Sequence, residues 1–315
     1  MPNKHPESIV LITNPNSTRS ATVEQAVTQP LQAYVDEHSL DFTHIQTKFR
    51  SAEDNVKDLM DRLPDEAHVL SAAGDGTAEQ LVNAALRSEK DLTLGLLPYG
   101  NFNDMASAHM DKKQTVLDVL HAPTTELRPM TVAVNGEYWR HAPAYVTLGL
   151  TARIAAGFDS PESRKVMKAA SRPERVVRRL SQAVSDYFRY SQQALPAFRI
   201  NDGEVVTDST DVAASNNEVA AGMIRAQDTY YGDPYFGARA DLNMGNIFEA
   251  ASFGALSLAG HSPLERTEAL RLSFEKASDI PIQTGGEFQQ LHNVHEIFVY
   301  KNPKDILKVL HPKLT

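Results

Sequence analysis

Two short segments of this chain combine glycine with a carboxylate or an amide, residue types that are suited to binding a phosphate. One segment covers residues 72–77 (AAGDGT) and the other covers residues 97–104 (LPYGNFND). Each follows an apolar run and leads into a helical pattern. A glycine turn between a strand and a helix exposes backbone N–H groups at the positive end of the helix dipole, where anions bind. The two segments therefore predict a phosphate-binding site.

Asp75 is the residue of these segments with the clearest chemical use, because it lies between Gly74 and Gly76. The glycines let a ligand approach the backbone closely, and the carboxylate between them can bind a metal ion or accept a proton. An ordinary turn aspartate is the competing interpretation, and the flanking glycines favour the ligand. Neither segment has the spacing of a Walker loop or of the dinucleotide fingerprint.

Together with residues 9–17 (IVLITNPNS), the two segments resemble the catalytic domain of diacylglycerol kinases and the related bacterial lipid kinases and sphingosine kinases. In that family a first strand leads to Asn-Pro-x-Ser, and Gly-Gly-Asp-Gly-Thr and Pro-x-Gly-Thr-x-Asn-Asp follow. Gly-Asp-Gly alone is shared with NAD kinases, but here all three motifs occur in order. The resemblance implies an ATP-dependent kinase that uses ATP and Mg²⁺ and transfers the γ-phosphoryl group to a lipid hydroxyl.

The resemblance also implies which residues contact the nucleotide and its metal ion. Asp75 and Asp104 are the predicted metal ligands, and Asp75 is also a predicted catalytic residue. Other roles compete at some positions, since Thr47 suits a plain strand and Thr77 suits a helix N-cap. The predicted nucleotide-binding residues are Asn14, Asn16, Ser17, Thr47, Ala73, Gly74, Asp75, Gly76, Thr77, Gly100, Asn101 and Asn103.

Two departures from the family pattern bear on activity. The family has Asp-Gly-Glu near its C-terminus, with the Asp assigned as proton acceptor in bacterial members, but this chain reads Gly285-Gly286-Glu287. Glu287 and Asp75 are then the candidates for the proton acceptor, and low activity is expected. The family segment that holds a structural magnesium ion reads LNMGNI at residues 242–247, without its carboxylate, although Asp241 is close.

The composition sets limits on the class of protein. A length of 315 residues suggests about two domains. The chain has no cysteine, which excludes disulfides and thiolate metal sites and favours a reducing cytoplasm. The sequence lacks a signal peptide pattern and an apolar run long enough to span a membrane. A net charge of −9 argues against a nucleic-acid-binding protein.

The elements that position the glycine segments are predicted to form an α/β domain at residues 1–126. Strand patterns at residues 8–13 and 42–49 alternate with helical patterns at residues 21–37 and 52–63, and Pro30 is expected to kink or end the first helix. Alternating strands and helices predict a parallel sheet covered on both faces. Ligands of such sheets bind beyond the carboxyl ends of the strands, where both glycine turns fall.

Residues 127–300 are predicted to form a second, β-rich and sandwich-like domain that binds the lipid substrate. Short strand patterns separated by turn signals replace the alternation, and one long helical insert is expected at residues 161–194. The family resemblance implies that the last residues, 301–315, return to the first domain.

Basic residues are concentrated in the segment 164–189 of this acidic chain. A solvated helical face is the ordinary interpretation. The sharper hypothesis is a peripheral contact with an anionic membrane at its inner face, since each basic residue contributes ~1 kcal/mol near such a surface. The sequence also leaves open whether the chain forms a homodimer. The cluster consists of Arg164, Lys165, Lys168, Arg172, Arg175, Arg178, Arg179 and Arg189.

Two other functions remain as alternatives to the lipid kinase. One is a kinase of a soluble acceptor, as in NAD kinases, and the Pro-x-Gly-x-x-Asn-Asp segment argues against it. The other is a catalytically weak nucleotide-binding or regulatory protein, which the missing carboxylates favour.

Overall fold

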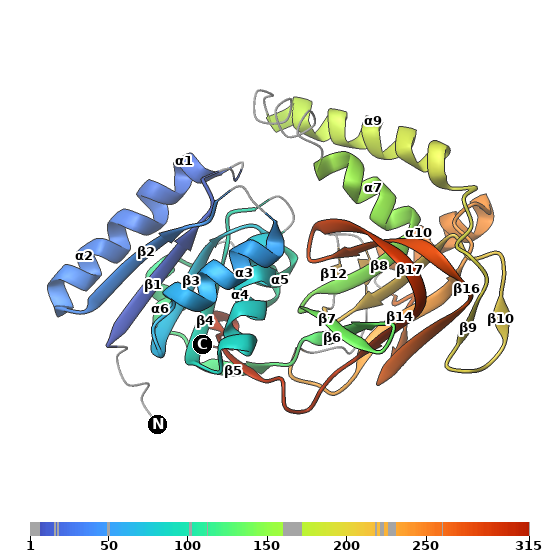
Figure 1. The fold of residues 1–315 in the computed structure, drawn as a ribbon. Coiled ribbons are helices and arrows are strands. Elements are labelled where there is room, and N and C mark those ends of the chain that lie inside the picture. Colours follow the sequence, from blue (N-terminus) through green and yellow to red (C-terminus); the bar gives the residue numbers. More distant parts are fainter. Residues whose placement is uncertain are drawn as a thin grey trace. The chain divides into compact units, whose positions relative to one another are not determined.

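The chain divides into two compact units, which are described separately here (Figure 1). Unit 1 consists of residues Met1–Pro129 and Pro303–Thr315, and unit 2 consists of Met130–Asn302. The computed structural model describes residues 7–15, 17, 19–48, 51–100, 103–111, 113–159, 172–217, 219–220, 224–225, 231–259 and 261–314.

Unit 1 is built on a six-stranded sheet with the strand order β2-β1-β3-β4-β18-β5. The first five strands in this order are parallel, and β5 pairs with β18 in the antiparallel direction. The strands are β1 (Ser8–Thr13), β2 (Asp41–Gln46), β3 (Glu66–Ala73), β4 (Asp91–Pro98), β5 (Thr124–Leu127) and β18 (Leu307–Leu310). The helices are α1 (Ser20–Val23), η1 (Glu24–Thr28), α2 (Gln29–His38), α3 (Ala52–Arg62), α4 (Asp75–Ser88), α5 (Asp104–His109), α6 (Val116–Leu120) and η2 (Pro312–Leu314).

The parallel strands end level with one another, and this alignment creates the edge that carries the glycine turns. Thr13 at the end of β1 pairs with Gln46 of β2 and Ala72 of β3, and Ala73 pairs with Pro98 of β4. The central strands are apolar along their length, as expected of a sheet buried on both faces. On one face, side chains of β1 pack with those of α2 and α6.

Pro30 does not end the first helix, and the kink expected there stays a prediction. The helical segment runs from Ser20 to His38, with a π-helical turn, Glu24–Thr28, just before the proline. Pro30 lies inside this continuous helical segment, just after the π-helical turn. The wider π turn shifts the hydrogen-bonding pattern there, so the helix accommodates the proline.

Unit 2 is built on a ten-stranded antiparallel sheet, and the predicted fold class, a parallel α/β domain followed by a β-rich domain, is confirmed. The main strand order is β15-β14-β11-β8-β16-β17-β6-β7; β9 pairs with β10 and β16, and β12 and β13 form a separate pair. The strands are β6 (Met130–Val134), β7 (Glu137–Ala142), β8 (Tyr145–Gly149), β9 (Phe198–Ile200), β10 (Val205–Val206), β11 (Asp211–Ser215), β12 (Val219–Ala220), β13 (Ile224–Arg225), β14 (Phe236–Leu242), β15 (Glu265–Thr267), β16 (Ala269–Thr284) and β17 (Glu287–Tyr300).

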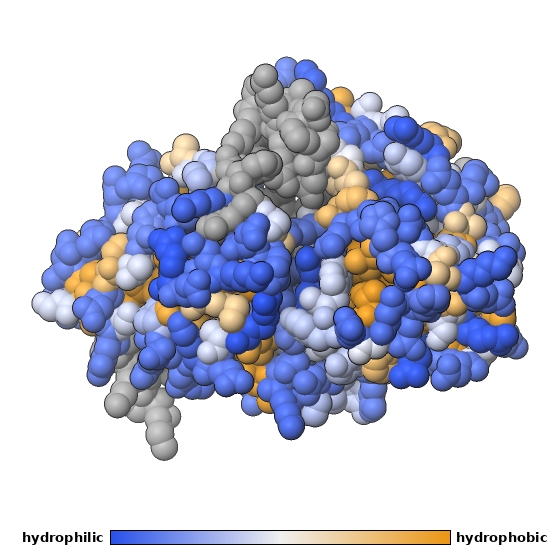
Figure 2. Space-filling model, in the orientation of Figure 1, coloured by the Kyte–Doolittle hydropathy of each residue, from blue (hydrophilic) through white to orange (hydrophobic). Residues whose placement is uncertain are grey.

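In the described part of unit 2, three helices accompany this sheet: α7 (Leu150–Asp159), α9 (Arg172–Tyr190) and α10 (Ile247–Leu258). The face of the molecule in Figure 2 is mostly hydrophilic. Among the residues that the structure describes, no helix combines the length and apolar character needed to cross a bilayer.

Helix α7 is anchored at its start by a buried carboxylate on β11. Asp211 accepts a hydrogen bond from the Thr151 N–H at 3.0 Å and another from the Thr151 hydroxyl. Gly149 precedes the helix with a φ of +83°, and a Cβ there would lie 2.2 Å from the Thr210 carbonyl oxygen. Burial raises the pKa of Asp211 to about 7, although the Thr151 bonds and nearby Arg153 lower it.

We expect Asp211 to make the stability of unit 2 depend on pH. The folded protein holds the Asp211 proton up to pH ~7, whereas an unfolded aspartate releases it near pH ~3.9, so this contribution to stability falls as pH rises between these values. Asp211→Asn has no charge to bury. Urea unfolding at pH 5 and pH 8 should show the unfolding free energy of the variant rising relative to that of the wild type, by about 1.4 kcal/mol for each pH unit between pH 5 and the folded pKa of about 7.

The control for this measurement is Asp241→Asn, because Asp241 is a solvent-exposed carboxylate of the same unit. The difference in unfolding free energy between this variant and the wild type should be similar at both pH values. If Asp211→Asn also differs from the wild type by the same unfolding free energy at pH 5 and pH 8, Asp211 does not retain its proton on folding.

Candidate functional site

The site residues predicted for unit 1 come together at the carboxyl edge of four adjacent strands, β2, β1, β3 and β4. Each lies at the end of its strand or in the segment that follows it. Asn16 and Asn101 lie outside the described residues. The others group as Thr47 after β2, Asn14 and Ser17 after β1, Ala73 at the end of β3, Gly74 to Thr77 after β3, and Gly100, Asn103 and Asp104 after β4.

Asp75 joins the two glycine segments to each other. Its Oδ2 accepts a hydrogen bond from the Asn103 N–H at 2.8 Å, and its Oδ1 accepts one from the Met105 N–H at 3.2 Å. Asn103 and Met105 lie at the start of α5, whose own N-cap residue provides no side-chain cap. A carboxylate from the β3–α4 turn therefore caps the helix that follows β4.

The pKa of Asp75 reflects two opposing influences. Burial raises this pKa above its ordinary value, and hydrogen bonds from backbone N–H groups, led by that of Met105, lower it. Desolvation disfavours the charged form, while N–H donors favour it. Asp75 is only 9% exposed, and the neighbouring Gly74 and Gly76 are less buried.

The backbones of Gly74 and Gly100 are in direct contact. A Cβ on Gly100 would lie 2.3 Å from the Gly74 Cα, and a Cβ on Gly74 would lie 3.2 Å from the Gly100 Cα. Asn103 holds this arrangement: its Oδ1 accepts from the Gly100 N–H, and its Nδ2 donates to the Gly100 carbonyl oxygen at 3.1 Å. Asn103 itself has a φ of +59°, a conformation that asparagine tolerates better than most residues.

The loop after β1 is tied to both glycine segments. Asn14 Nδ2 donates to the Thr77 hydroxyl oxygen at 3.4 Å, and the Ser17 hydroxyl donates to the Tyr99 carbonyl oxygen at 2.6 Å. Arg19, which the sequence reasoning missed, donates from a guanidinium nitrogen to the Pro98 carbonyl oxygen at 3.3 Å. It places a positive charge at this edge, and the only signal for it in the sequence is its position two residues after Ser17.

The structural alternatives to ligand binding at Thr77 and Thr47 can be compared with the geometry. Thr77 is not the N-cap of α4, because the helix begins at Asp75 and Gly74 is its N-cap. Thr47 donates both its N–H, at 2.9 Å, and its hydroxyl, at 3.4 Å, to the Thr13 carbonyl oxygen. Its contacts are those of a structural threonine, and nucleotide binding there stays a prediction.

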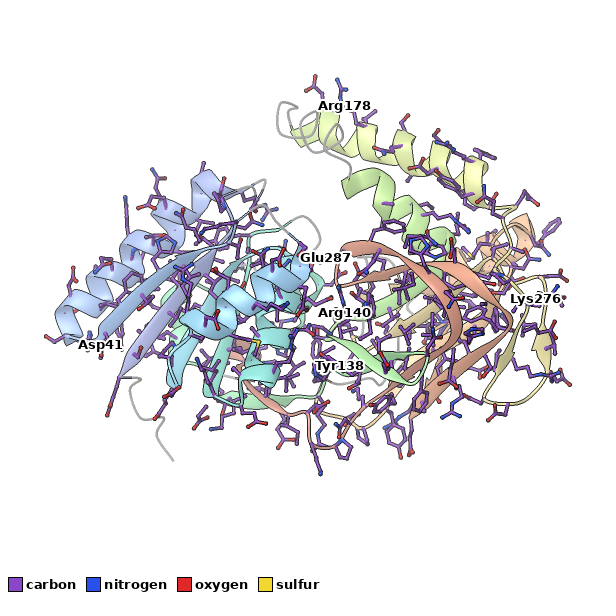
Figure 3. The ribbon with its side chains drawn as sticks, viewed as in Figure 1. Asp41, Tyr138, Arg140, Arg178, Lys276 and Glu287 are labelled. Atoms are coloured by element: carbon purple, nitrogen blue, oxygen red, sulfur yellow. The ribbon has the colours of Figure 1, made fainter. Side chains whose placement is uncertain are left out.

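Glu287 lies in unit 2, where it follows a tight hairpin turn. Thr284 pairs with Glu287 across the hairpin, and the turn residues Gly285 and Gly286 have φ values of +48° and +95°. Positive φ at both central residues is typical of a type I′ turn, so the segment is not extended. Glu287 Oε2 is 3.8 Å from a guanidinium nitrogen of Arg140, and the two side chains lie at the same end of the hairpin (Figure 3).

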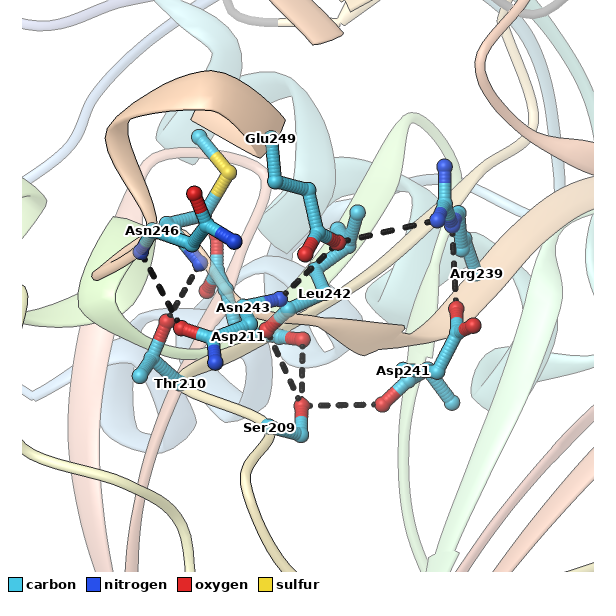
Figure 4. Close-up of polar contacts among 11 residues, drawn as sticks. Ser209, Thr210, Asp211, Arg239, Asp241, Leu242, Asn243, Asn246 and Glu249 are labelled. Atoms are coloured by element: carbon cyan, nitrogen blue, oxygen red, sulfur yellow. Dashed lines mark hydrogen bonds and ion pairs between the residues drawn. The ribbon is translucent and has the colours of Figure 1, made fainter. Parts of the chain in front are cut away.

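Residues 242–247 correspond to the segment that holds a structural magnesium ion in the family. In this chain their polar groups make hydrogen bonds to other protein groups (Figure 4). The Asn243 N–H donates to Glu249 Oε1 at 3.1 Å, and the Met244 N–H donates to the Thr210 hydroxyl oxygen at 2.8 Å. Asp241 forms an ion pair with Arg239 at 2.9 Å. Among the described residues no group of three His, Cys, Asp or Glu could hold a metal ion. These residues do not fit a structural magnesium ion.

The Gly74–Gly100 contact predicts unequal effects of two similar substitutions. Gly100→Ala should lower the melting temperature strongly and weaken nucleotide binding, because its Cβ meets backbone that cannot move aside. Gly74→Ala should be milder, because its Cβ contact is longer. Thermal unfolding and nucleotide titration of both variants test this order, and equal melting temperatures would contradict it.

Comparison with known proteins agrees with this architecture. Residues 8–133 match the family model described as the diacylglycerol kinase catalytic domain. A search of curated proteins finds no match. A crystal structure described as a diacylglycerol kinase from Bacillus anthracis str. Sterne is 16% identical, with a TM-score of 0.65 over 99% of this chain and 100% of that chain. A diacylglycerol kinase-like protein of the same organism is 17% identical, with a TM-score of 0.66 over 98% of each chain.

At these identities the solved structures show the shared fold, while the family model covers the motifs themselves. The matched range includes the loop after β1, the Gly-Asp-Gly turn and the start of α5. Residues 8–133 therefore belong to the diacylglycerol kinase catalytic domain family, as their motifs indicated, and they give this chain a kinase-type domain.

Proposed function

We propose that this protein is an ATP-dependent phosphotransferase that moves a γ-phosphoryl group to the hydroxyl of a lipid. The observation that carries the proposal is the bridge from Asp75 to the start of α5, within a domain of the diacylglycerol kinase catalytic family. This bridge fixes two glycine turns side by side at one sheet edge. Kinases work mainly by positioning and charge neutralisation, and a rigid, preformed phosphate site serves both.

The N-terminus of α4 is the proposed phosphate site. The first N–H groups of a helix have no intrahelical acceptor, and Gly74, the N-cap, provides no side chain to satisfy them. Gly76 and Thr77 present N–H groups there, and Arg19 adds a nearby positive charge. Asn14 and Ser17 close the site from the β1 side.

The carboxylates at this edge fit a magnesium ion that binds together with the nucleotide. Such an ion keeps several waters and needs only one or two carboxylates besides the phosphates. Asp75 and Asp104 are the residues that would hold it, and its role would be to neutralise phosphate charge. Each Asp75 oxygen already accepts an N–H, so the carboxylate is held in one orientation before any ligand binds.

The transfer needs an acceptor for the proton of the attacking hydroxyl. A bond forms between the γ-phosphorus and the lipid oxygen, the bond to the bridging oxygen of ADP breaks, and the hydroxyl proton moves to a base. Asp75 and Glu287 are the proposed bases. Burial raises the pKa of Asp75, which increases its affinity for a proton. Glu287 is paired with Arg140 at 3.8 Å, so its carboxylate already has a cationic partner.

A catalytically weak nucleotide-binding or regulatory protein is the second candidate function. It is favoured by Gly285, which stands where the family has its acidic residue, and by the ion pair of Glu287. A kinase of a soluble acceptor is a further alternative for the same nucleotide site. The proposed partners are a nucleotide, a lipid substrate, an anionic membrane contacted through the basic segment 164–189, and a second copy of the chain.

Asp75→Asn tests the proposed site. Asparagine keeps one acceptor oxygen and places an NH₂ group against a backbone N–H, so unfolding free energy should fall by about 1–3 kcal/mol with the fold retained. Magnesium-dependent ATP turnover should fall at least tenfold, about 1.4 kcal/mol in activation free energy. ATP titration calorimetry and turnover with a panel of lipids measure both.

The matched control is Asp91→Asn, because Asp91 begins β4 at the opposite edge of the same sheet and pairs with Lys308 in solvent. It should leave ATP binding and turnover unchanged. If Asp75→Asn binds and uses ATP as the wild type does, the site is wrongly assigned; ATP binding by the wild type without any turnover would favour the regulatory alternative.

Gly285→Asp tests the missing acid. The left-handed conformation at residue 285 is one that aspartate tolerates better than most residues, so the hairpin should survive. If the wild type lacks its base, turnover should increase, since a general base typically contributes about 10²–10⁴ in rate. Gly285→Asn is the control, because it has a similar shape without the carboxylate. An unchanged rate from a wild type that already turns over at ~1–100 s⁻¹ would refute the low-activity hypothesis.

A further inference from the structure

Helix α9 presents an apolar stripe to solvent instead of burying it. Val177, Val184 and Phe188 are spaced by seven and four residues, which places them on one face of the helix. Their side chains are 67%, 46% and 74% exposed. In Figure 2, orange side chains interrupt the hydrophilic surface along this helix. An amphipathic helix of a globular domain normally turns such a stripe toward the core.

The face of α9 opposite this stripe is the one that packs inward, and it carries polar, aromatic and alanine side chains. A Cβ on Gly157 of α7 would lie 2.5 Å from Asp186 Oδ2 and 3.0 Å from Gln182 Nε2, so the two helices approach closely there. Burial raises the pKa of Asp186, although Arg189 and Gln182 lower it. Residues two positions apart on a helix are rotated by about 200° around its axis, so Val184 points away from the face that Asp186 occupies.

The end of α9 is fixed to the body of unit 2, so the stripe has a defined orientation. The Tyr187 hydroxyl donates to the Met244 carbonyl oxygen at 2.8 Å, and Gln192 Nε2 donates to the Gly245 carbonyl oxygen at 3.2 Å. A Cβ on Gly245 would lie 2.5 Å from the Ser191 carbonyl oxygen. Rotation of α9 to bury its stripe would break these contacts.

The charges beside the stripe indicate what covers it. Arg178 and Arg189 are exposed, and each follows an apolar residue of the stripe by one position, about 100° around the helix, so they flank it. The sequence of the helix contains five arginines against Glu174 and Asp186. A symmetric contact between two copies would bring equal positive faces together, whereas an anionic bilayer attracts them. An apolar stripe flanked by arginine is the pattern of a helix that lies in a membrane interface.

We propose that α9 lies in the surface of an anionic lipid bilayer, with Val177, Val184 and Phe188 inserted among the acyl chains. The arginines then contact lipid headgroups, and insertion adds a component of binding that salt does not remove. This inference rests on the proposed function in one respect: the bilayer would be the source of the lipid that accepts the phosphoryl group. The binding of the protein to vesicles is measured without any turnover.

Insertion can be observed directly because the chain has no cysteine. Phe188→Cys and Val184→Cys give single attachment sites for an environment-sensitive fluorophore. With vesicles of phosphatidylcholine and phosphatidylglycerol, the emission of both should shift to the blue, and with phosphatidylcholine alone the shift should be weaker. Tyr138→Cys is the control, because Tyr138 is 46% exposed on β7 and lies away from Arg178 of α9 (Figure 3). It should show no shift.

Substitutions separate insertion from charge attraction. Val184→Ser with Phe188→Ser should weaken vesicle binding at least tenfold, about 1.4 kcal/mol, both at about 0.1 M and at about 0.5 M salt. Arg178→Gln should weaken binding at the lower salt and have little effect at the higher salt, because screening already removes its contribution. Tyr138→Ser should bind as the wild type does.

Other occupants of the stripe give distinct results. A blue-shifted label without vesicles that depends on protein concentration indicates a second copy, and sedimentation of the Phe188→Ser variant should then show loss of a dimer. A blue-shifted label without vesicles at all concentrations indicates cover by the same chain. Either result overturns the proposal, as does vesicle binding that the Val184→Ser and Phe188→Ser substitutions leave unaffected.

Turnover of a short-chain lipid acceptor in micelles tests the kinase activity independently of vesicle binding. The serine variants should retain this turnover.

Discussion

The bridge made by the Asp75 carboxylate is the interaction on which the proposed nucleotide-binding edge of unit 1 depends. Without it, the β3–α4 turn and the start of α5 would be joined only through the sheet, the Gly74–Gly100 contact and the hydrogen bonds between Asn103 and Gly100. With it, the Asn103 and Met105 N–H groups are satisfied by a residue 28 or 30 positions earlier in the chain. The contact between Gly74 and Gly100 is the steric counterpart of this bridge, since two backbones can meet so closely only where neither carries a side chain.

Asp75 therefore has a structural role and, in the proposed function, a chemical role as well. A buried carboxylate is expensive unless hydrogen bonds compensate for its lost hydration, and backbone N–H groups provide that compensation here. The same donors fix the carboxylate in place, so it loses little additional freedom when a ligand binds. Such preorganisation is the general way in which enzyme sites reduce reorganisation during reaction. It also means that the effect of substituting Asp75 on activity must be separated from its effect on stability.

The sequence was sufficient to predict the edge but not the connections across it. Strand and helix patterns together with the glycine turns placed the site residues after β1 to β4, because parallel strands end at a common edge. The cap that Asp75 provides to α5 and the contact of Arg19 with Pro98 depend on side-chain direction in space, which periodicity does not encode.

The position of β18 has a consequence for how the chain folds during synthesis. This strand, Leu307–Leu310, lies between β4 and β5, so the sheet of unit 1 lacks an interior strand until residues on the far side of unit 2 have been made. Unit 2 is continuous in sequence and can form its sheet as soon as it leaves the ribosome. Unit 1, although made first, can complete its sheet only last, after closing a loop as long as the whole of unit 2. During that interval β4 and β5 expose unpaired edges, which makes this half of the chain the part that most needs protection from aggregation.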